Sequence, residues 1–395
     1  MAIPTNELQD LLNRPAAEQE SVGYANTARE IAGQPKVWRG TLDVVMEAWG
    51  RLSGFLAGSQ RLLITGAGSS FYAALSVVPS LRRTYRCVET IPSTEILMDP
   101  DSAFPGEEFI LVSLARSGDS PEGNAILELA EKLRPGLVKH LVITCNGNGE
   151  LARLVDSRGS LGFKLLLPKE ANDKSLAMTA SFSSMTIAGY ALGFLRLPQA
   201  YRETVEGLAQ GAEELLSRGP HLAAVLSQEG YDRMFFLGSR PYLGGVMEAH
   251  LKVQELSGGT VIAKAEDTLG FRHGFMAAVD ANSLIVLALS QDPCRQRYEL
   301  DLLREIRRKG IGRKVVAMIG GKNAISRSEI AEVTDWHFDY GPADCVTDEV
   351  QAPLVAVTGQ LLGLFLSLRA GLRPDNPSPS GVINRVVQGV RIHPC

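Results

Sequence analysis

The chain has 395 residues, of which 45% are hydrophobic and 21% are charged, and its formal net charge is −4. This composition is typical of a globular protein large enough for two domains, and it excludes disordered and fibrous classes. The balance of charge provides no basic surface for nucleic acid or for a membrane, so we expect neither as a partner.

Cysteine usage and the chain's apolar runs indicate a compartment. The five cysteines are scattered, without the spacing of metal ligands, which favours a reducing environment over a disulfide framework. The N-terminal segment MAIPTNELQDLLNR lacks the basic-then-apolar order of a signal peptide, and the longest apolar run, residues 360–368, is too short to span a membrane. We therefore expect a cytoplasmic protein.

Residues 1–60 predict helices, because apolar residues such as Trp38, Leu42 and Val45 recur at helical spacing. Pro35 should end or bend the first long helix. We expect residues 1–50 to form a helical arm.

From residue 61 onward, short apolar runs alternate with helical patterns. Strands are predicted at 62–65, 109–114, 141–144 and 163–167, with helices between them. Strands and helices that alternate in this way predict a mainly parallel, doubly wound sheet with helices on both faces.

The same order recurs in the second half of the chain. Strands are predicted at 233–237, 284–289 and 315–319, and long apolar helices close the two halves at 182–195 and 354–368. Repetition at a near-constant offset indicates a duplicated domain, with a charged helical linker within residues 197–230. We predict an α/β protein of two three-layer α/β/α domains, at 51–200 and 215–372, followed by a tail at 373–395.

Two hydroxyl-rich turns follow strands of the first half: GAGSS at 66–70 and RSGDS at 116–120. Ligands of open parallel sheets bind outside the carboxyl ends of the strands, and backbone N–H groups at a helix start favour an anion. The two turns could together hold one phosphate group, although ordinary helix caps remain the alternative. Phe71 replaces the third glycine of a dinucleotide fingerprint, so a dinucleotide is not expected.

In the second half, Glu248, Lys252 and Glu255 fall on one face of a predicted helix. They could form a solvated ion-pair stripe, or a carboxylate beside a cation suited to proton transfer at carbon. His273 stands between glycines in the loop-like segment GFRHGF, which suggests an approachable histidine; a structural role also stays open.

Taken together, these motifs resemble the double sugar-isomerase (SIS) domain family from about residue 30 to the tail. The tail segments NPSPSG (376–381) and NRVVQG (384–389) are similar to one branch in particular, called galactosamine-6-phosphate deaminase or tagatose-6-phosphate ketose/aldose isomerase. The resemblance implies two tandem SIS domains.

The resemblance also implies roles for individual residues. Glu255 moves a proton between C2 and C1, and Lys252 assists at the C2 substituent or orients Glu255. His273 opens the sugar ring and reaches the site from a partner subunit, while Thr179 contacts the sugar. The residues implied to hold the sugar phosphate are Ser69, Ser70, Ser117 and Ser120.

The chain departs from the family pattern at Ala115 and Arg116, where a serine and a neutral residue are common. We expect Arg116 to add positive charge to phosphate binding. The family's tail lysine has no clear counterpart, and Arg385 is the nearest cation. Since the chain shows no glutaminase domain before residue 30, ammonia supply from glutamine is not expected.

The function implied is an amino-sugar-phosphate deaminase/isomerase that converts D-galactosamine 6-phosphate and water to D-tagatose 6-phosphate and ammonia. We expect neither a metal ion nor a redox cofactor, and a homodimer or larger homo-oligomer. The alternatives are a glucosamine-6-phosphate deaminase, an aldose–ketose 6-phosphate isomerase, or a non-catalytic sugar-phosphate-binding regulator.

Overall fold

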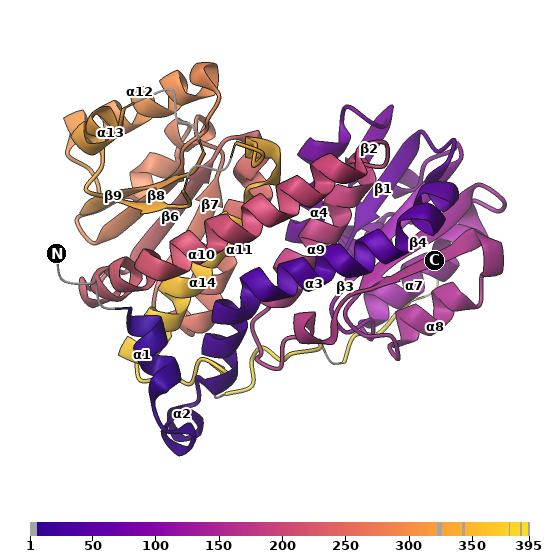
Figure 1. The fold of residues 1–395 in the computed structure, drawn as a ribbon, viewed down its shortest axis with the longest axis horizontal. Helices are drawn as coiled ribbons and strands as arrows, with labels where there is room; N and C mark the ends of the chain where they lie inside the picture. Colours follow the sequence, from indigo (N-terminus) through magenta and orange to yellow (C-terminus); the bar gives the residue numbers. More distant parts are fainter. Residues whose placement is uncertain (1–5, 322–325, 342–343, 379, 388, 394–395) are drawn as a thin grey trace. The chain divides into compact units, whose positions relative to one another are not determined.

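The computed structural model describes residues 6–321, 326–341, 344–378, 380–387 and 389–393. The chain divides into two compact units, and each contains one five-stranded parallel sheet (Figure 1). We call them the first-sheet unit (36–172, 180–205 and 381–395) and the second-sheet unit (1–35, 173–179 and 206–380). The domain boundaries expected from the sequence stay a prediction.

The first sheet has the strand order β2-β1-β3-β4-β5, and every neighbouring pair is parallel. Its strands are β1 (Arg61–Thr65), β2 (Cys87–Thr90), β3 (Phe109–Ala115), β4 (Val138–Thr144) and β5 (Gly162–Leu166). Leu63 and Leu111 lie opposite each other in register, and both are fully buried. The long apolar runs therefore form the centre of the sheet, as predicted.

The second sheet repeats this topology. Its strands are β6 (Arg233–Gly238), β7 (Ile262–Glu266), β8 (Ser283–Ala288), β9 (Lys314–Ile319) and β10 (Trp336–Asp339). Their order is β7-β6-β8-β9-β10, again all parallel, so the second-first-third-fourth-fifth arrangement of the first sheet recurs. The predicted duplication of a doubly wound α/β domain is confirmed.

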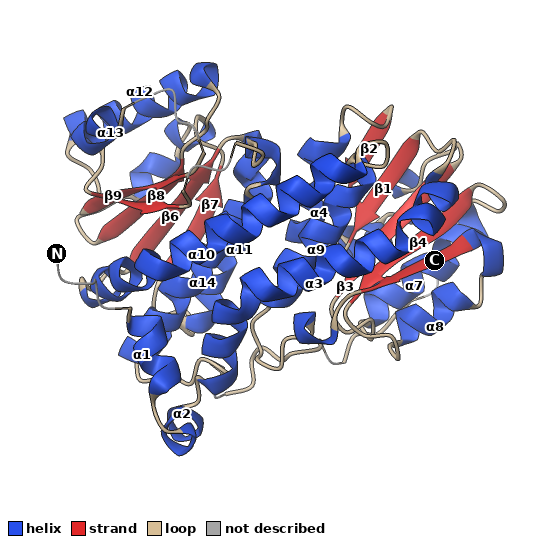
Figure 2. Ribbon diagram, viewed as in Figure 1, coloured by secondary structure: helices blue, strands red, loops and turns tan. Residues whose placement is uncertain are grey.

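Helices lie on both faces of each sheet (Figure 2). Those of the first-sheet unit are α4 (Ser69–Leu81), α5 (Ser93–Met98), α6 (Pro100–Ala103), α7 (Pro121–Leu133), α8 (Glu150–Asp156) and α9 (Ala180–Tyr190). Those of the second-sheet unit are α11 (Leu243–Leu256), α12 (Pro293–Lys309), α13 (Arg327–Val333) and α14 (Ala352–Arg369). Short 3₁₀ turns complete the units: η1 (Gly159–Leu161), η2 (Lys169–Ala171), η3 (Ala191–Gly193), η4 (Arg240–Tyr242), η5 (Gly270–Arg272), η6 (Phe275–Ala278) and η7 (Asp348–Val350).

The apolar faces of the helices fill the core. In the first-sheet unit, Ile126 of α7 and Leu151 of α8 pack with Leu111 of β3. In the second-sheet unit, Leu303 of α12 and Ile330 of α13 pack against the strands in the same manner. The opposite face of the second sheet carries α11, which contacts β6, β7 and α14.

The N-terminal region contains α1 (Glu7–Asn13), α2 (Ala16–Val22) and the long α3 (Ala25–Leu56). Of the two outcomes expected at Pro35, an end to the helix is wrong, since α3 continues through it, and a bend stays a prediction. Proline removes the N–H that would bond the carbonyl of Ile31. The Gln34 side chain supplies a replacement, because its Nε2 donates to that carbonyl oxygen at 3.3 Å. The predicted helical linker is α10 (Pro198–Gln228).

Among the described residues, one helix, α14, is long and apolar enough to cross a membrane by length and composition. The sequence prediction placed only a shorter run there. However, 89% of the window that passes this test is buried inside the structure. A Cβ on Gly359 would lie 2.3 Å from the Cα of Ala249, so α14 packs backbone to backbone on α11. The apolar composition of α14 is that of a core helix.

Candidate active site

The predicted phosphate turns lie at the topological switch point of the first sheet. The chain passes from β1 outward to β2 and then returns to β3 on the other side of β1, and β1 and β3 are direct neighbours. In this strand order a ligand binds outside the carboxyl ends of the two central strands. Both turns begin there, since one follows Thr65 and the other follows Ala115.

The first turn joins β1 to the start of α4. A Cβ at Gly66 would lie 2.7 Å from the backbone carbon of Ser70, and Gly68 has a φ of +54°, so both positions favour glycine. Ser69 and Ser70 form the first residues of α4 and are 5% and 6% exposed. Their backbone N–H groups belong to the helix start, where the helix dipole favours an anion, and the N–H of Ser70 donates to the carbonyl of Ala67 at 3.1 Å.

The second turn is fixed by its neighbours. Gly118 has a φ of +69°, and its carbonyl accepts from the N–H of Leu151 at 2.9 Å. The side chain of Asn146 donates to the carbonyl of Ser117 at 2.8 Å. Ser120 occupies the N-cap position of α7 without a side-chain capping bond, and its hydroxyl donates to Glu122 Oε2 at 2.6 Å. These contacts hold the turn in place at the start of α7.

Arg116 is buried and points toward the chain's tail. It is 6% exposed, and its Nη2 donates to the backbone carbonyl of Arg385 at 2.7 Å. Arg385 in turn donates to Asn172 Oδ1 at 2.7 Å. Arg116 therefore does not merely face solvent, and its contribution to phosphate binding stays a prediction.

The three charged residues of α11 form one ion-pair network. Lys252 Nζ lies 2.6 Å from Glu255 Oε2 and 3.3 Å from Glu248 Oε1. The side chains of Lys252 and Glu248 are fully buried, whereas that of Glu255 is 22% exposed. A solvated ion-pair stripe is therefore excluded. Glu255 is the end of the network that a solute can approach.

Close packing and charge together explain why a lysine is stable in this position. A Cβ on Gly363 of α14 would lie 2.7 Å from the carbonyl oxygen of Lys252, which shows how closely α14 covers this helix. Burial opposes the charged ammonium, but Glu248 and Glu255 outweigh it, and the pKa of Lys252 is raised above its usual value. The ammonium therefore stays charged and orients the carboxylate of Glu255.

Thr179 is fully buried beside a pair of acidic residues. Its N–H and hydroxyl donate to the carboxylate of Asp173 at 2.8 and 2.7 Å. The neighbouring Ser175 donates through its N–H and hydroxyl to Glu30 of α3. Burial, followed by repulsion from Asp173, raises the pKa of Glu30 to about 7. That Thr179 contacts a sugar stays a prediction.

His273 lies in an exposed loop, as expected from its flanking glycines. It directly follows η5, its N–H donates to the carbonyl of Gly270 at 2.8 Å, and Gly274 has a φ of +113°. Its side chain is accessible.

The structure thus gathers the predicted residues into sets within each unit. The five turn residues belong to the first-sheet unit, and Lys252, Glu255, Thr179 and His273 belong to the second. Sequence reasoning missed Glu30 as a partner of the Thr179 loop, and no local pattern marks it. No cluster of three or more His, Cys, Asp or Glu side chains suited to a metal ion occurs in the part of the chain that the structure describes.

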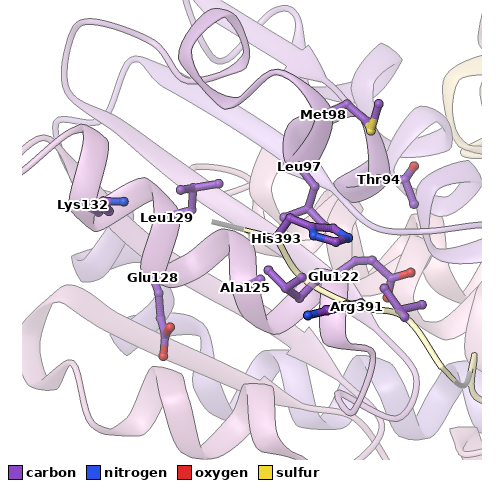
Figure 3. A pocket seen from close by; sticks show the side chains of 12 residues that line it. Thr94, Leu97, Met98, Glu122, Ala125, Glu128, Leu129, Lys132, Arg391 and His393 are labelled. Carbon is purple, nitrogen blue, oxygen red and sulfur yellow. The ribbon is translucent and has the colours of Figure 1, made fainter. Parts of the chain in front are cut away.

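A pocket of about 570 Å³ lies in the first-sheet unit between α5, α7 and the tail (Figure 3). Arg391 and His393 of the tail line it together with Leu97 of α5 and Glu122 of α7. None of the nine predicted site residues lines it. Through Glu122 and its bond to Ser120, however, the pocket borders the second phosphate turn.

Comparisons with known proteins agree on one group. No family model matches the chain. An AgaS protein of Streptomyces coelicolor is 40% identical, and the alignment covers 93% of this chain and 95% of that one. D-galactosamine-6-phosphate deaminase AgaS of Shewanella sp. strain ANA-3 is 34% identical, with 93% and 92% covered. A solved structure from Clostridium novyi, assigned to the tagatose-6-phosphate ketose/aldose isomerases, is 33% identical, with a TM-score of 0.89 and 98% of each chain covered.

Proposed function

This chain belongs to the AgaS family of tandem SIS-domain proteins, and we propose that it converts D-galactosamine 6-phosphate and water to D-tagatose 6-phosphate and ammonia. The observation that carries this proposal is the network on α11, in which a buried, charged Lys252 orients the partly exposed carboxylate of Glu255. Relatives at 33–40% identity over 93% of the chain bear the name of this deaminase, which supports the choice of substrate.

The phosphate group of the substrate binds at the turns that follow β1 and β3. Backbone N–H groups at the start of α4 and hydroxyl groups from both turns supply donors, and the helix dipole adds favourable charge. The four serines involved are Ser69, Ser70, Ser117 and Ser120. Arg116 adds a positive charge behind the second turn. These contacts fix one end of the sugar without taking part in the chemistry.

The proton transfer belongs to Glu255. Once the ring is open, the substrate is a 2-amino aldehyde whose C2–H is acidic because it adjoins the carbonyl. The carboxylate of Glu255 removes this proton, and the C1 oxygen is protonated, which leaves an enolamine. Return of the proton to C1 gives an imine at C2, and water hydrolyses the imine to the ketose and ammonia. A single positioned carboxylate suffices for the C2-to-C1 step.

We assign ring opening to His273, because its exposed loop position allows it to act on a sugar that is bound to another subunit. We propose that the histidine acts in a partner subunit's site, which requires a homodimer or a larger homo-oligomer. We further propose a cytoplasmic enzyme that hydrolyses a C–N bond, with neither metal nor redox cofactor required for the proton shift.

The test is ammonia release from galactosamine 6-phosphate by wild type and by Glu255→Gln, an uncharged variant of the same size. We expect release by wild type and a loss of about 10²- to 10⁴-fold in kcat for the variant, the usual contribution of a general base. No release by wild type, or equal release by the variant, contradicts the mechanism. Parallel assays with glucosamine 6-phosphate and with tagatose 6-phosphate separate the other deaminase and the simple isomerase. Tight binding without any turnover would identify a regulator.

A further inference from the structure

The second sheet has its own switch point, which the proposed mechanism does not use. β6 and β8 are direct neighbours, as β1 and β3 are in the first sheet. The turn after β6 enters η4 and α11, and the turn after β8 enters α12 at Pro293, as the second phosphate turn enters α7 at Pro121. The carboxyl ends of β6 and β8, which we call this edge, are therefore the topological counterpart of the proposed phosphate site.

One side chain of the same chain fills this edge. Asp348 of η7 is 3% exposed. Its Oδ1 accepts from the Tyr242 hydroxyl at 2.6 Å and from the N–H of Gln291 at 2.9 Å. Its Oδ2 accepts from the Ser290 hydroxyl and from Arg295 Nη2, the latter at 2.7 Å. Donors from both turns therefore converge on a single carboxylate.

The four donors are those that a phosphate group requires: two hydroxyls, a backbone N–H and a guanidinium. Three of them come from the turn after β8 and the start of α12, and the fourth comes from the turn after β6. A second acidic group, Glu299, accepts from the N–H of Ser290 at 2.7 Å, and burial raises the pKa of its carboxyl to about 7. Asp348 makes the shorter ion pair with Arg295, at 2.7 Å, and Glu349 lies 4.0 Å from the same guanidinium nitrogen.

We propose that the carboxyl ends of β6 and β8 form a second oxyanion site, which Asp348 occupies as a built-in anion. The native chain therefore takes up no phosphate at this edge, and removal of the Asp348 carboxylate opens it to an anion of the phosphate class. In the second sheet, the carboxylate of Asp348 therefore takes the place that a phosphate ligand takes in the first sheet.

The position of Asp348 has a consequence for α11. Asp348 lies just before α14, whose first residue, Ala352, comes within 3.0 Å of a Cβ built on Gly245 of α11. Further along, Gly359 and Gly363 of α14 pack on the backbone of α11 at Ala249 and Lys252. The hydrogen bonds of Asp348 thus hold the segment just before α14 in place, and α14 packs against α11, the helix that carries Lys252.

The test asks whether phosphate restores the stability of Asp348→Ala. Its thermal unfolding is measured in inorganic phosphate and in sodium chloride of equal ionic strength. We expect the variant to be less stable than wild type in chloride. In phosphate at about 100 times the Kd, its Tm should rise by about 5 °C more than that of wild type. Asp348→Asn, which keeps the volume of the side chain, should show no such excess, because no space is opened.

Asp292→Ala is the matched control. Asp292 lies in the same turn and caps α12 through the N–H groups of Cys294 and Arg295, so its loss weakens the turn without vacating the site. A phosphate-dependent rise in Asp348→Ala no larger than in Asp292→Ala overturns the proposal. So does a variant that remains unfolded in phosphate as in chloride, since an occupied site should restore the fold. The readout is stability alone, so it does not depend on which sugar the enzyme turns over.

Discussion

Lys252→Met is the substitution that most directly tests the energetics of the α11 network. It keeps the length and apolar stem of the side chain and removes only the ammonium. The ammonium lies 2.6 Å from Glu255 and 3.3 Å from Glu248, and both Lys252 and Glu248 are fully buried. Removing it leaves a buried carboxylate without its counter-charge.

The expected cost follows from that geometry. Removing one partner of a buried ion pair destabilises a protein by about 3–5 kcal/mol, whereas an exposed pair contributes about 0–1 kcal/mol. The buried Glu248 places this network in the first class, although the 22% exposure of Glu255 reduces the share of that pair. Because the pKa of Lys252 is raised, its stabilising charge is complete below its usual pKa of 10.5 and is lost only as the pH rises through the higher folded value. The full effect should therefore be present at pH 7.

The assay is urea unfolding of wild type, Lys252→Met and the double variant Lys252→Met/Glu248→Gln. Neutralising Glu248 removes the stranded charge, so the double variant should recover at least about 1 kcal/mol relative to the single variant. Activity should not recover, since Glu255 still lacks its orienting partner. A loss below about 1 kcal/mol for Lys252→Met would refute the buried-network reasoning, because that is the range of a surface pair.

Three further predictions concern groups outside this network. The folded pKa of Glu30 is raised from 4.5 to about 7, so its carboxyl favours the folded state below pH 4.5, and this contribution is lost as the pH rises to about 7. The free energy of unfolding of wild type should therefore fall between pH 4.5 and 7 relative to that of Glu30→Gln. The same pH dependence in both proteins contradicts the assignment. Gly118→Ala forces a side chain into a φ of +69° and should cost about 1–2 kcal/mol in urea unfolding while raising KM for the sugar phosphate, whereas Gly123→Ala, within α7 and with nothing near its Cβ, should do neither. Arg116→Gln should raise KM and speed proteolysis of the tail after residue 381, since its contact with the Arg385 carbonyl is weakened; unchanged KM and cleavage would show that this contact has no role in binding.

The central strands and the edge strand β5 were predictable from sequence, whereas the other three edge strands were not. β1, β3, β4, β6, β8 and β9 are almost wholly buried, so each contains an apolar run. β2, β7 and β10 lie at sheet edges and are mostly partly or fully exposed, and their sequences carry no such run. Burial on both faces produces a long apolar run, and these three edge strands lack it, whereas the edge strand β5 still carries apolar residues at Phe163, Leu165 and Leu166.

The candidate site shows the same limit. Glu248, Lys252 and Glu255 could be grouped because all three lie on one helix face, but their burial depends on α14, about a hundred residues later. The hydrogen-bond partners of Asp348 and Glu30 lie on other elements, far away in the sequence. Gln291 lies 57 positions from Asp348, and Ser175 lies 145 positions from Glu30. No local periodicity encodes such contacts. The Gln34 side chain that allows α3 to continue through Pro35 was likewise not evident from a rule about proline alone.

The central claim is that Glu255 carries a proton from C2 to C1, and turnover of galactosamine 6-phosphate in D₂O tests it most directly. A carboxylate that has accepted the C2 proton exchanges it with solvent in part, so tagatose 6-phosphate made by wild type should carry deuterium at C1 by mass spectrometry or NMR. Glu255→Gln, with its network partner Lys252 intact, should lose both turnover and label. Product free of deuterium would contradict a C2 proton held on a carboxylate that solvent reaches, and labelled product formed at the wild-type rate by Glu255→Gln would remove Glu255 from the chemistry.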